Sequence, residues 1–427
     1  MWGYWLFIAY EALFMHLSLP TDALAMSESD YVFIICVNTL ILIAVLMKRY
    51  SNDQKFVVFI IGGLFLRLFF MFWSEYCSHI FTLPNSGADE LTYYYNAMSN
   101  MVKDKEFTGY AQFFAWQANI YGLSKIYGKF INVLLSVSSI TILRRILIKL
   151  DIDYDVQTIT IALACFLPNF AIISSLLLRE SSIIFLISVS AYYFIAWWQK
   201  HGCRNLLFSL VASVIAAWLH SGMVAYTIGI LCVAVASKKT MNDHKYSIMS
   251  IRTLIVTVMT AVAILAVLMN LDIGLTNYFK GAESLSDIVS ISDAYEDGGS
   301  AYNANVVSND TTIGFIVNTP FRILYFMFAP MPWDWRSATD MIAFLFSGLF
   351  YGYVFLKSIP YVFKKNRYPL VSAMFMIALL LLMMFGWGVS NSGTALRHRD
   401  KMVIHYLILF ALIKNDNVVR SKRLTRR

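Results

Sequence analysis

Long apolar runs separated by short polar connections recur along this chain from end to end. Runs of about 17 to 23 residues are almost free of charge, and a hydrocarbon layer about 30 Å thick requires spanning helices of that length. The pattern predicts an all-α polytopic membrane protein, with residues 1–427 forming a single integral membrane domain of about twelve transmembrane helices. The predicted spans are 2–19, 31–47, 56–73, 129–148, 156–178, 182–198, 205–219, 222–237, 253–270, 339–357, 369–387 and 401–414.

The polar connections differ in charge according to the side on which they fall. Alternate connections and the C-terminal tail hold about two-thirds of the 34 Lys and Arg residues, in stretches such as KRYSNDQK (48–55) and KKNR (364–367). Connections rich in Lys and Arg remain on the cytoplasmic side of a membrane. We therefore expect both termini in the cytoplasm and two long extracytoplasmic loops, 74–128 and 271–338.

Each long loop contains a stretch that is too short or too polar to span. Residues 110–127 combine aromatic and amide side chains, which suits an amphipathic helix at the headgroup layer. Residues 320–333 are apolar but short, so they predict a re-entrant or interfacial helix that stops at Pro330 and Pro332.

Composition narrows the class of protein further. The chain is 59% hydrophobic and 14% charged, whereas soluble domains carry about 25% charged residues. The net charge of +8 lies mainly beside the membrane spans, which argues against a nucleic-acid partner. The five cysteines are scattered, with neither metal-binding nor disulfide spacing.

The first candidate motif is SGADELTYYYNAM (86–98), in the first outside loop. Asp89 or Glu90 is suited to deprotonate an acceptor hydroxyl, and Tyr93 and Tyr94 to line a sugar or position a phosphate. The alternative is an ordinary solvated acidic loop that ends in a helix cap.

The second motif is LLLRESSIIFLI (176–187), where Arg179 and Glu180 interrupt an apolar hairpin. Charges at the membrane boundary are costly and usually pair or face an aqueous cavity, and the planar fork of arginine suits phosphate. Adjacent helical residues point about 100° apart, so we expect Arg179 to face substrate and Glu180 to pair with Arg397 or Arg399. The alternative is a tight turn between two helices.

Two further outside connections carry cations. His220 lies in WLHSGM (218–223), where a turn histidine is more often structural than catalytic. Arg397, His398 and Arg399 precede the last span on the outside, against the charge rule, which favours anion ligands over membrane anchors. Together these connections bring carboxylates, arginines and a histidine to one face, as a cavity for a phosphate-bearing lipid requires. The chain has no Walker loop, dinucleotide fingerprint, HExxH motif or nucleophile elbow.

In their order and common sidedness, these motifs resemble those of EpsG-like and Wzy-type bacterial polysaccharide polymerases. LLLRESSIIFLI and WLHSGM resemble the arginine-led turn and the His-Ser hairpin of that group, and GADELTYYYNA (87–97) resembles its acidic first-loop motif. The same acidic motif resembles one in the wider GT-C membrane glycosyltransferases. FMFAPMPWDW (326–335) and NSGTALRHRDKMVIHYLIL (391–409) resemble late motifs of the polymerase-like families. The acids here are adjacent, whereas GT-C enzymes often have Asp-x-Asp or Glu-x-Asp, which leaves the identity of the base open.

The resemblance implies a GT-C-like fold and a membrane glycosyltransferase of the bacterial cytoplasmic membrane. It would join undecaprenyl-(di)phosphate-linked sugars or repeat units at the outer face, for O-antigen, capsule or exopolysaccharide. Arg179, Arg397 and Arg399 would stabilise charge on the leaving phosphate. Asp89 is the first candidate for the base and Glu90 the second.

His220 would hydrogen-bond substrate or orient a partner group. The resemblance implies no cofactor and leaves a divalent metal open. The expected partners are the lipid-linked glycan, membrane lipid, and a chain-length regulator or a flippase.

Three other classes compete with this interpretation. A flippase or other transporter of a lipid-linked sugar would also need arginines, but along its spans near the midplane, where only Glu11 and Arg67 occur here. A membrane O-acyltransferase would use His220. A non-enzymatic scaffold in a membrane complex would need none of these side chains.

The predicted topology can be tested at residue 300, inside the second long loop. We expect a Ser300→Cys variant to react with a membrane-impermeant thiol reagent in intact cells, because the charge bias puts this loop outside. The unmodified chain, with its five native cysteines, is the control. Labelling that appears only after lysis would reverse the topology and remove the argument for a common face.

Overall fold

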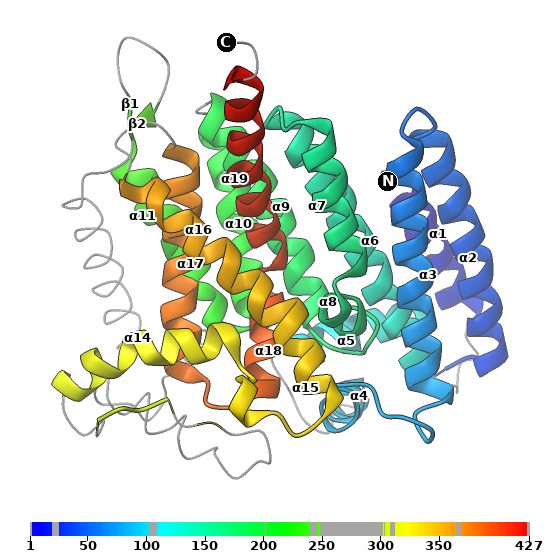
Figure 1. The fold of residues 1–427 in the computed structure, drawn as a ribbon. Helices are drawn as coiled ribbons and strands as arrows, with labels where there is room; N and C mark the ends of the chain where they lie inside the picture. Colours follow the sequence, from blue (N-terminus) through cyan, green and yellow to red (C-terminus); the bar gives the residue numbers. More distant parts are fainter. Residues whose placement is uncertain are drawn as a thin grey trace. The chain divides into compact units, whose positions relative to one another are not determined.

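The computed structural model is built almost entirely of helices (Figure 1). The structure describes residues 2–18, 25–101, 109–200, 202–239, 246–247, 302, 304–307, 312–363 and 369–424. They divide into two compact units, the first formed by Met1–Ile142 with Ile161–Phe185 and the second by Leu143–Thr160 with Leu186–Arg427. The helical architecture confirms the all-α class predicted from the apolar runs.

Among the described residues, six helical segments are long and apolar enough to cross a membrane, which supports the prediction of a membrane protein. They are α2 (Glu28–Arg49), α3 (Gln54–Tyr76), α6 (Lys125–Lys149), α9 (Glu180–Lys200), α15 to α16 (Ala338–Phe363) and α17 (Pro369–Gly388). Shorter apolar helices occupy four more of the predicted spans or interfacial positions: α7 (Tyr154–Phe166), α10 (Cys203–Leu219), α11 (Val224–Ala236) and α14 (Thr312–Phe328). The predicted span 253–270 and more than half of the predicted loop 271–338 lie outside the described residues.

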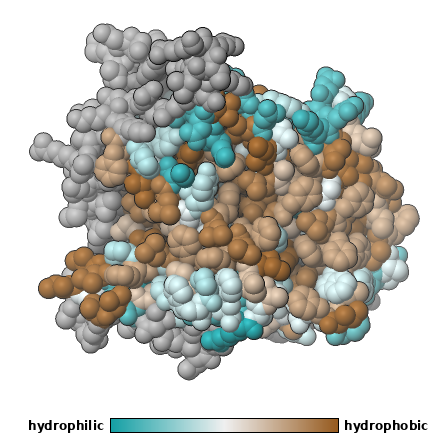
Figure 2. All heavy atoms as spheres, in the orientation of Figure 1, coloured by the Kyte–Doolittle hydropathy of each residue, from teal (hydrophilic) through white to brown (hydrophobic). Residues whose placement is uncertain are grey.

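Lipid-facing positions are visible as a stripe on individual helices. On α2 the exposed large side chains Phe33, Leu40 and Met47 follow one another at intervals of seven residues, or two helical turns. Figure 2 shows apolar side chains along much of the visible surface, with hydrophilic ones gathered toward helix ends. An exposed apolar stripe of this kind is expected where hydrocarbon replaces water.

The first unit contains α1 (Trp2–Ser18), α2, α3, α4 (Ala88–Met101), α5 (Tyr110–Tyr121) and α8 (Pro168–Ile173), with parts of α6, α7 and α9. Helix α4 begins with Asp89 and Glu90 in its first turn, where carboxylates favour the helix dipole. The predicted interfacial helix 110–127 is shorter than expected. Helix α5 ends at Gly122, whose φ of 89° suits glycine, and α6 starts at Lys125.

The predicted span 156–178 is not continuous, because α7 ends at Phe166 and α8 begins at Pro168. Proline has no N–H, so the carbonyl of Ala164, four residues earlier, loses its helical donor. The fully buried guanidinium of Arg67 supplies the missing bonds, with Nη2 donating to Ala164 at 3.1 Å and Nη1 to Cys165 at 2.8 Å. Its Nε also donates to hydroxyl groups on α6 and at the end of α8.

The second unit contains α10, α11, α14, α16 (Leu349–Phe363), α17, α18 (Ser392–Asp400) and α19 (Val403–Leu424), with parts of α6, α7 and α9. Its smaller elements are β1 (Lys238–Lys239), β2 (Tyr246–Ser247), η1 (Ser221–Met223), η3 (Pro332–Asp334), α15 (Ala338–Ala343) and η4 (Phe344–Gly348). The strands β1 and β2 pair antiparallel over two residues.

Helix α14 starts earlier and ends earlier than the predicted helix 320–333, at Thr312 and Phe328. Figure 1 shows that α14 runs across α17 rather than alongside it. The two backbones approach closely, since a Cβ added at Gly386 of α17 would lie 3.3 Å from the Ile323 Cα of α14. This close crossing favours glycine at that position.

The structural role of Arg67 can be tested together with Pro168, because Arg67 donates to the carbonyl that Pro168 leaves without a helical donor. We expect Arg67→Met to lower the free energy of unfolding by about 2 kcal/mol or more, because buried carbonyls lose their donors. Adding Pro168→Ala should recover part of that loss, since this substitution would restore a backbone N–H at the position that pairs with the Ala164 carbonyl. Melting curves of the purified variants provide the measurement, with Arg49→Met at the exposed end of α2 as control.

If Arg67→Met melts like the wild type, Arg67 does not hold the α7–α8 break. If Pro168→Ala lowers the melting temperature equally with and without Arg67, the two residues act independently.

Candidate functional site

The centre of the candidate site in the first unit is the turn 174–179, which joins α8 to α9. A turn buried in a membrane protein must find donors and acceptors for its backbone groups. Here the Asn132 side-chain amide donates to the carbonyls of Leu176 and Leu178, at 2.7 and 2.9 Å. The backbone N–H of Leu177 donates to Glu90 Oε1 at 2.6 Å. The turn predicted from LLLRESS is therefore present, buried and held from two other helices.

Glu90 belongs to a network of buried and half-buried charges centred on Lys129. Lys129 is 1% exposed, and its ammonium lies 3.3 Å from Glu90 Oε1 and 2.8 Å from Glu75 Oε2. It also donates to Ser74 Oγ at 2.9 Å. Lys125 pairs with the other oxygen of Glu75 at 2.8 Å. A buried ammonium requires this many partners, because its desolvation costs several kcal/mol when it is unpaired.

Tyr110, the first residue of α5, contacts α4 and lies near Glu180 at the start of α9. Its ring meets that of Tyr93 edge-on at 4.9 Å between centroids, and its hydroxyl accepts from Asn132 at 3.4 Å. Burial raises the pKa of Tyr110 well above its usual value. The hydrogen bond from Asn132 lowers this pKa in part, and the nearby Tyr93, Glu180 and Glu90 raise it. The phenol therefore stays protonated and remains a hydrogen-bond donor. Tyr110 thus lies close to Glu90, Tyr93 and Glu180.

Arg179 and Asp89 differ from their neighbours in being accessible. Arg179 is half-buried, its Nε is buried, and no hydrogen bond or ion pair joins its guanidinium to any described residue. Asp89 is exposed in the first turn of α4, whereas the adjacent Glu90 is buried. Arg179 and Asp89 are thus the more accessible members of two adjacent pairs, Arg179–Glu180 and Asp89–Glu90.

In the second unit, His220 and His398 lie together in the interior. Their rings meet edge-on with centroids 4.8 Å apart, and His398 contacts the Phe385 ring at the same distance. His220 Nδ1 accepts from the backbone N–H of Gly222 at 3.2 Å, so its remaining nitrogen can donate. Lys401 Nζ lies 3.3 Å from His398 Nδ1. The pairing of His220 with His398 was not expected from the sequence.

Arg399 is fully buried and contacts the C-terminal end of α14. It donates to the carbonyl of Phe326 at 3.2 Å and to those of Met327 and Ala329, and its buried Nε has no hydrogen-bond partner among the described residues. Phe326 lies four residues before Pro330, so its carbonyl lacks a helical donor. Arg399 therefore caps a helix end, and a phosphate ligand would have to use the donors that remain on Nε and Nη2.

Arg397 immediately precedes the buried His398 and Arg399 and is itself half-buried. Glu180 is in the first unit, whereas Arg397 and Arg399 are in the second. The ion pair expected between Glu180 and one of these arginines therefore stays a prediction. That the site residues of the first unit and those of the second unit bind one substrate also stays a prediction.

The residues that sequence reasoning missed are Lys129, Asn132 and Tyr110. Lys129 and Asn132 are separated by three positions at the start of α6, so they share a helix face, and both are buried. A charge and an amide on one face of an apolar helix were the available signal. Among the described residues, no three His, Cys, Asp or Glu side chains converge as a metal site.

Comparison with known proteins gives this chain no relatives. No protein-family model matches it, and no curated protein or solved structure is significantly similar to it.

Proposed function

We propose that this chain is a membrane glycosyltransferase of the polysaccharide-polymerase type. It joins undecaprenyl-(di)phosphate-linked sugars or repeat units at the outer face of the bacterial cytoplasmic membrane, for O-antigen, capsule or exopolysaccharide. The proposal includes about twelve spans, a GT-C-like fold and cytoplasmic termini. Its support is the motif resemblance described above, together with the arrangement of charged groups in the first unit.

The observation that carries the proposal is that the Arg179 side chain is half-buried and has no hydrogen-bond or ion-pair partner among the described residues. It lies beside a turn whose backbone is held by Asn132 and Glu90. A cation in such a position retains its donors for a ligand, and the planar guanidinium binds phosphate through two parallel hydrogen bonds. The leaving group of the proposed reaction is a lipid-linked phosphate.

In the proposed reaction, an acceptor hydroxyl attacks the anomeric carbon of the lipid-linked sugar. The new bond joins the acceptor oxygen to that carbon, and the bond from the carbon to the phosphate oxygen breaks. Arg179 stabilises the negative charge that develops on the leaving phosphate. Asp89, which is exposed, accepts the proton of the acceptor hydroxyl.

The buried residue Glu90 positions the turn that carries Arg179. Glu90 holds the backbone of Leu177 and is itself held by Lys129, so it orients the turn that presents Arg179. Tyr93 and Tyr94 line the sugar, and Glu180, His220, Arg397 and Arg399 remain proposed ligands or supports of the phosphate. The proposed partners are the lipid-linked glycan, membrane lipid, and a chain-length regulator or flippase.

A transporter of a lipid-linked sugar is the alternative, and Arg67 argues against it. An intramembrane arginine that served cargo would retain donors for the cargo. Arg67 instead donates from all three of its nitrogens to protein groups, including the carbonyls of Gly63, Ala164 and Cys165.

The role of Arg179 can be tested with Arg179→Lys, which keeps the charge but loses the paired hydrogen bonds. We expect polymer formation to fall about ten- to a hundredfold, since a hydrogen bond to a charged group contributes about 1.5–3 kcal/mol. Glycan chain length would be measured in cells whose own copy is deleted and replaced by the variant. Membrane abundance should stay at the wild-type level, because no described residue depends on the guanidinium.

Arg49→Lys, at the exposed end of α2, is the matched control and should leave the glycan unchanged. Full-length glycan at wild-type levels from Arg179→Lys would show that Arg179 does not bind the phosphate through both donors.

The two adjacent acids can be separated by amide substitutions. We expect Asp89→Asn to abolish turnover without changing the melting temperature, because Asp89 is exposed. Glu90→Gln should lower both turnover and the free energy of unfolding, the latter by about 1–3 kcal/mol, because Lys129 and Leu177 lose a charged partner. Melting curves and product ladders of both purified variants provide the comparison.

Normal turnover by Asp89→Asn would contradict the assignment of Asp89 as the base. If Glu90→Gln were at the same time fully stable but inactive, Glu90 would be the base instead.

A further inference from the structure

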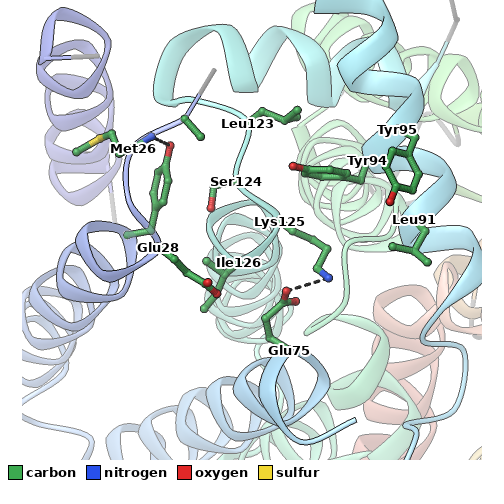
Figure 3. Close-up of a pocket in the computed structure, with 12 residues that line it drawn as sticks. Met26, Glu28, Glu75, Leu91, Tyr94, Tyr95, Leu123, Ser124, Lys125 and Ile126 are labelled. Carbon is green, nitrogen blue, oxygen red and sulfur yellow. Dashed lines mark hydrogen bonds and ion pairs between the residues drawn. The ribbon is translucent and has the colours of Figure 1, made fainter. Parts of the chain in front are cut away.

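A cavity of about 360 Å³ opens among the helix ends of the first unit (Figure 3). Known ligand sites in proteins have volumes of about 300–1,000 Å³, so this one is large enough for a small ligand. Its walls come from α2, α3, α4 and α6 and from the segments that precede α2 and α6. The polar groups used below are Glu28, Glu75, Tyr94, Tyr95, Ser124 and Lys125.

The charges around the cavity disfavour an anionic ligand. Two carboxylates, Glu28 and Glu75, line it beside a single lysine, Lys125, and no arginine is among the lining residues. Lys125 is already paired with Glu75 at 2.8 Å, as Figure 3 shows. Glu28 accepts a hydrogen bond from Tyr76 at 2.8 Å but has no cation partner among the described residues. A phosphate would therefore meet uncompensated negative charge.

The same walls disfavour a purely apolar ligand, because they offer many hydrogen-bonding groups. The hydroxyls of Tyr94 and Tyr95 have no hydrogen-bond partner among the described residues. Their rings lie 5.6 Å apart at 76° to each other, so they present faces in two directions. Leu91, Tyr94 and Tyr95 are spaced three and four positions apart, which sets them on one face of α4 toward the cavity (Figure 3).

We propose that this cavity binds one uncharged sugar ring of the glycan substrate. A sugar ring combines hydroxyl groups, which pair with carboxylate and tyrosine oxygens, with apolar C–H faces, which pack on aromatic rings. The carboxylates accept from the sugar hydroxyls, and the Tyr94 and Tyr95 hydroxyls donate or accept. That the ring belongs to a lipid-linked or growing glycan rests on the function proposed above, whereas the preference for a neutral sugar rests on the cavity.

The cavity is connected to the candidate site by shared charges. Glu75, in its wall, and Glu90, which holds the Leu177 backbone, bind the same Lys129 ammonium. A ligand that moves Glu75 therefore changes the partners available to Glu90. We place the sugar subsite next to the acidic turn of α4 for this reason.

The test is direct binding of methyl glycosides to the full chain in phospholipid nanodiscs, free of sugar-based detergents. Saturation-transfer NMR would be recorded with methyl glucoside, methyl galactoside, methyl mannoside and methyl N-acetylglucosaminide. We expect at least one of them to bind, and Tyr94→Ala and Tyr95→Ala each to weaken that binding about fivefold or more. Tyr94→Phe should weaken it less, because the ring is kept. Tyr10→Ala, at an exposed position of α1, is the control and should bind as the wild type does.

Inorganic phosphate should not displace the bound glycoside. The proposal is overturned if no glycoside binds the wild type, if both alanine variants bind as the wild type does, or if phosphate competes. Melting temperatures of the variants confirm that each is folded.

Binding and polymer formation separate this proposal from the function on which it builds. Glycoside binding that persists in Arg179→Lys while polymer is lost supports both. If polymer formation depends on Arg179 but no glycoside binds, the proposed function is supported and the proposed sugar site in the cavity is wrong. Glycoside binding in a protein whose deletion leaves the cell-surface glycan unchanged supports the cavity and rejects the function.

Discussion

A helix that stops inside a membrane protein leaves carbonyl groups without donors, and water is not available there to replace them. Both units of this chain meet the constraint in the same way. A proline breaks a helix, at Pro168 in the first unit and at Pro330 in the second, and the carbonyl four residues earlier loses its partner. A fully buried arginine from another helix, Arg67 or Arg399, donates to that carbonyl and to its neighbours. The two fully buried arginines thus bond to broken helix ends.

The breaks create irregular backbone where an uninterrupted helix would have none. In the first unit the chain after α8 runs through a buried turn before α9 starts, and Asn132 and Glu90 supply the hydrogen bonds of that turn. Holding the turn from two other helices fixes the direction in which Arg179 leaves it. Preorganisation of this kind is what a charge-stabilising site requires, since donors that are already oriented do not reorganise during reaction.

Hydropathy predicted the helices well and their interruptions poorly. A window average sees residues 156–178 as one apolar run, although the missing N–H of Pro168 divides it. In the same way, the aromatic pattern of 110–127 continues past Gly122, where the backbone turns. The site residues Asp89, Glu90, Arg179 and Glu180 could be singled out because they are charged in apolar surroundings. Their partners could not, since contacts of Lys129 with Glu75 and Glu90 join positions far apart in the chain.

The two adjacent acids of α4, Asp89 and Glu90, have different surroundings, and this difference explains why they are neighbours in the sequence. Neighbouring residues on a helix point about 100° apart, so one can enter the interior while the other stays in water. Glu90 reaches inward to Lys129 and the Leu177 backbone, and Asp89 is exposed. Sequence alone could not decide which acid turned inward, because the direction depends on the cation that α6 presents. Adjacency thus lets one short motif hold the turn beneath Arg179 through Glu90 and keep a second carboxylate, Asp89, at the surface, where the proposed reaction needs its base.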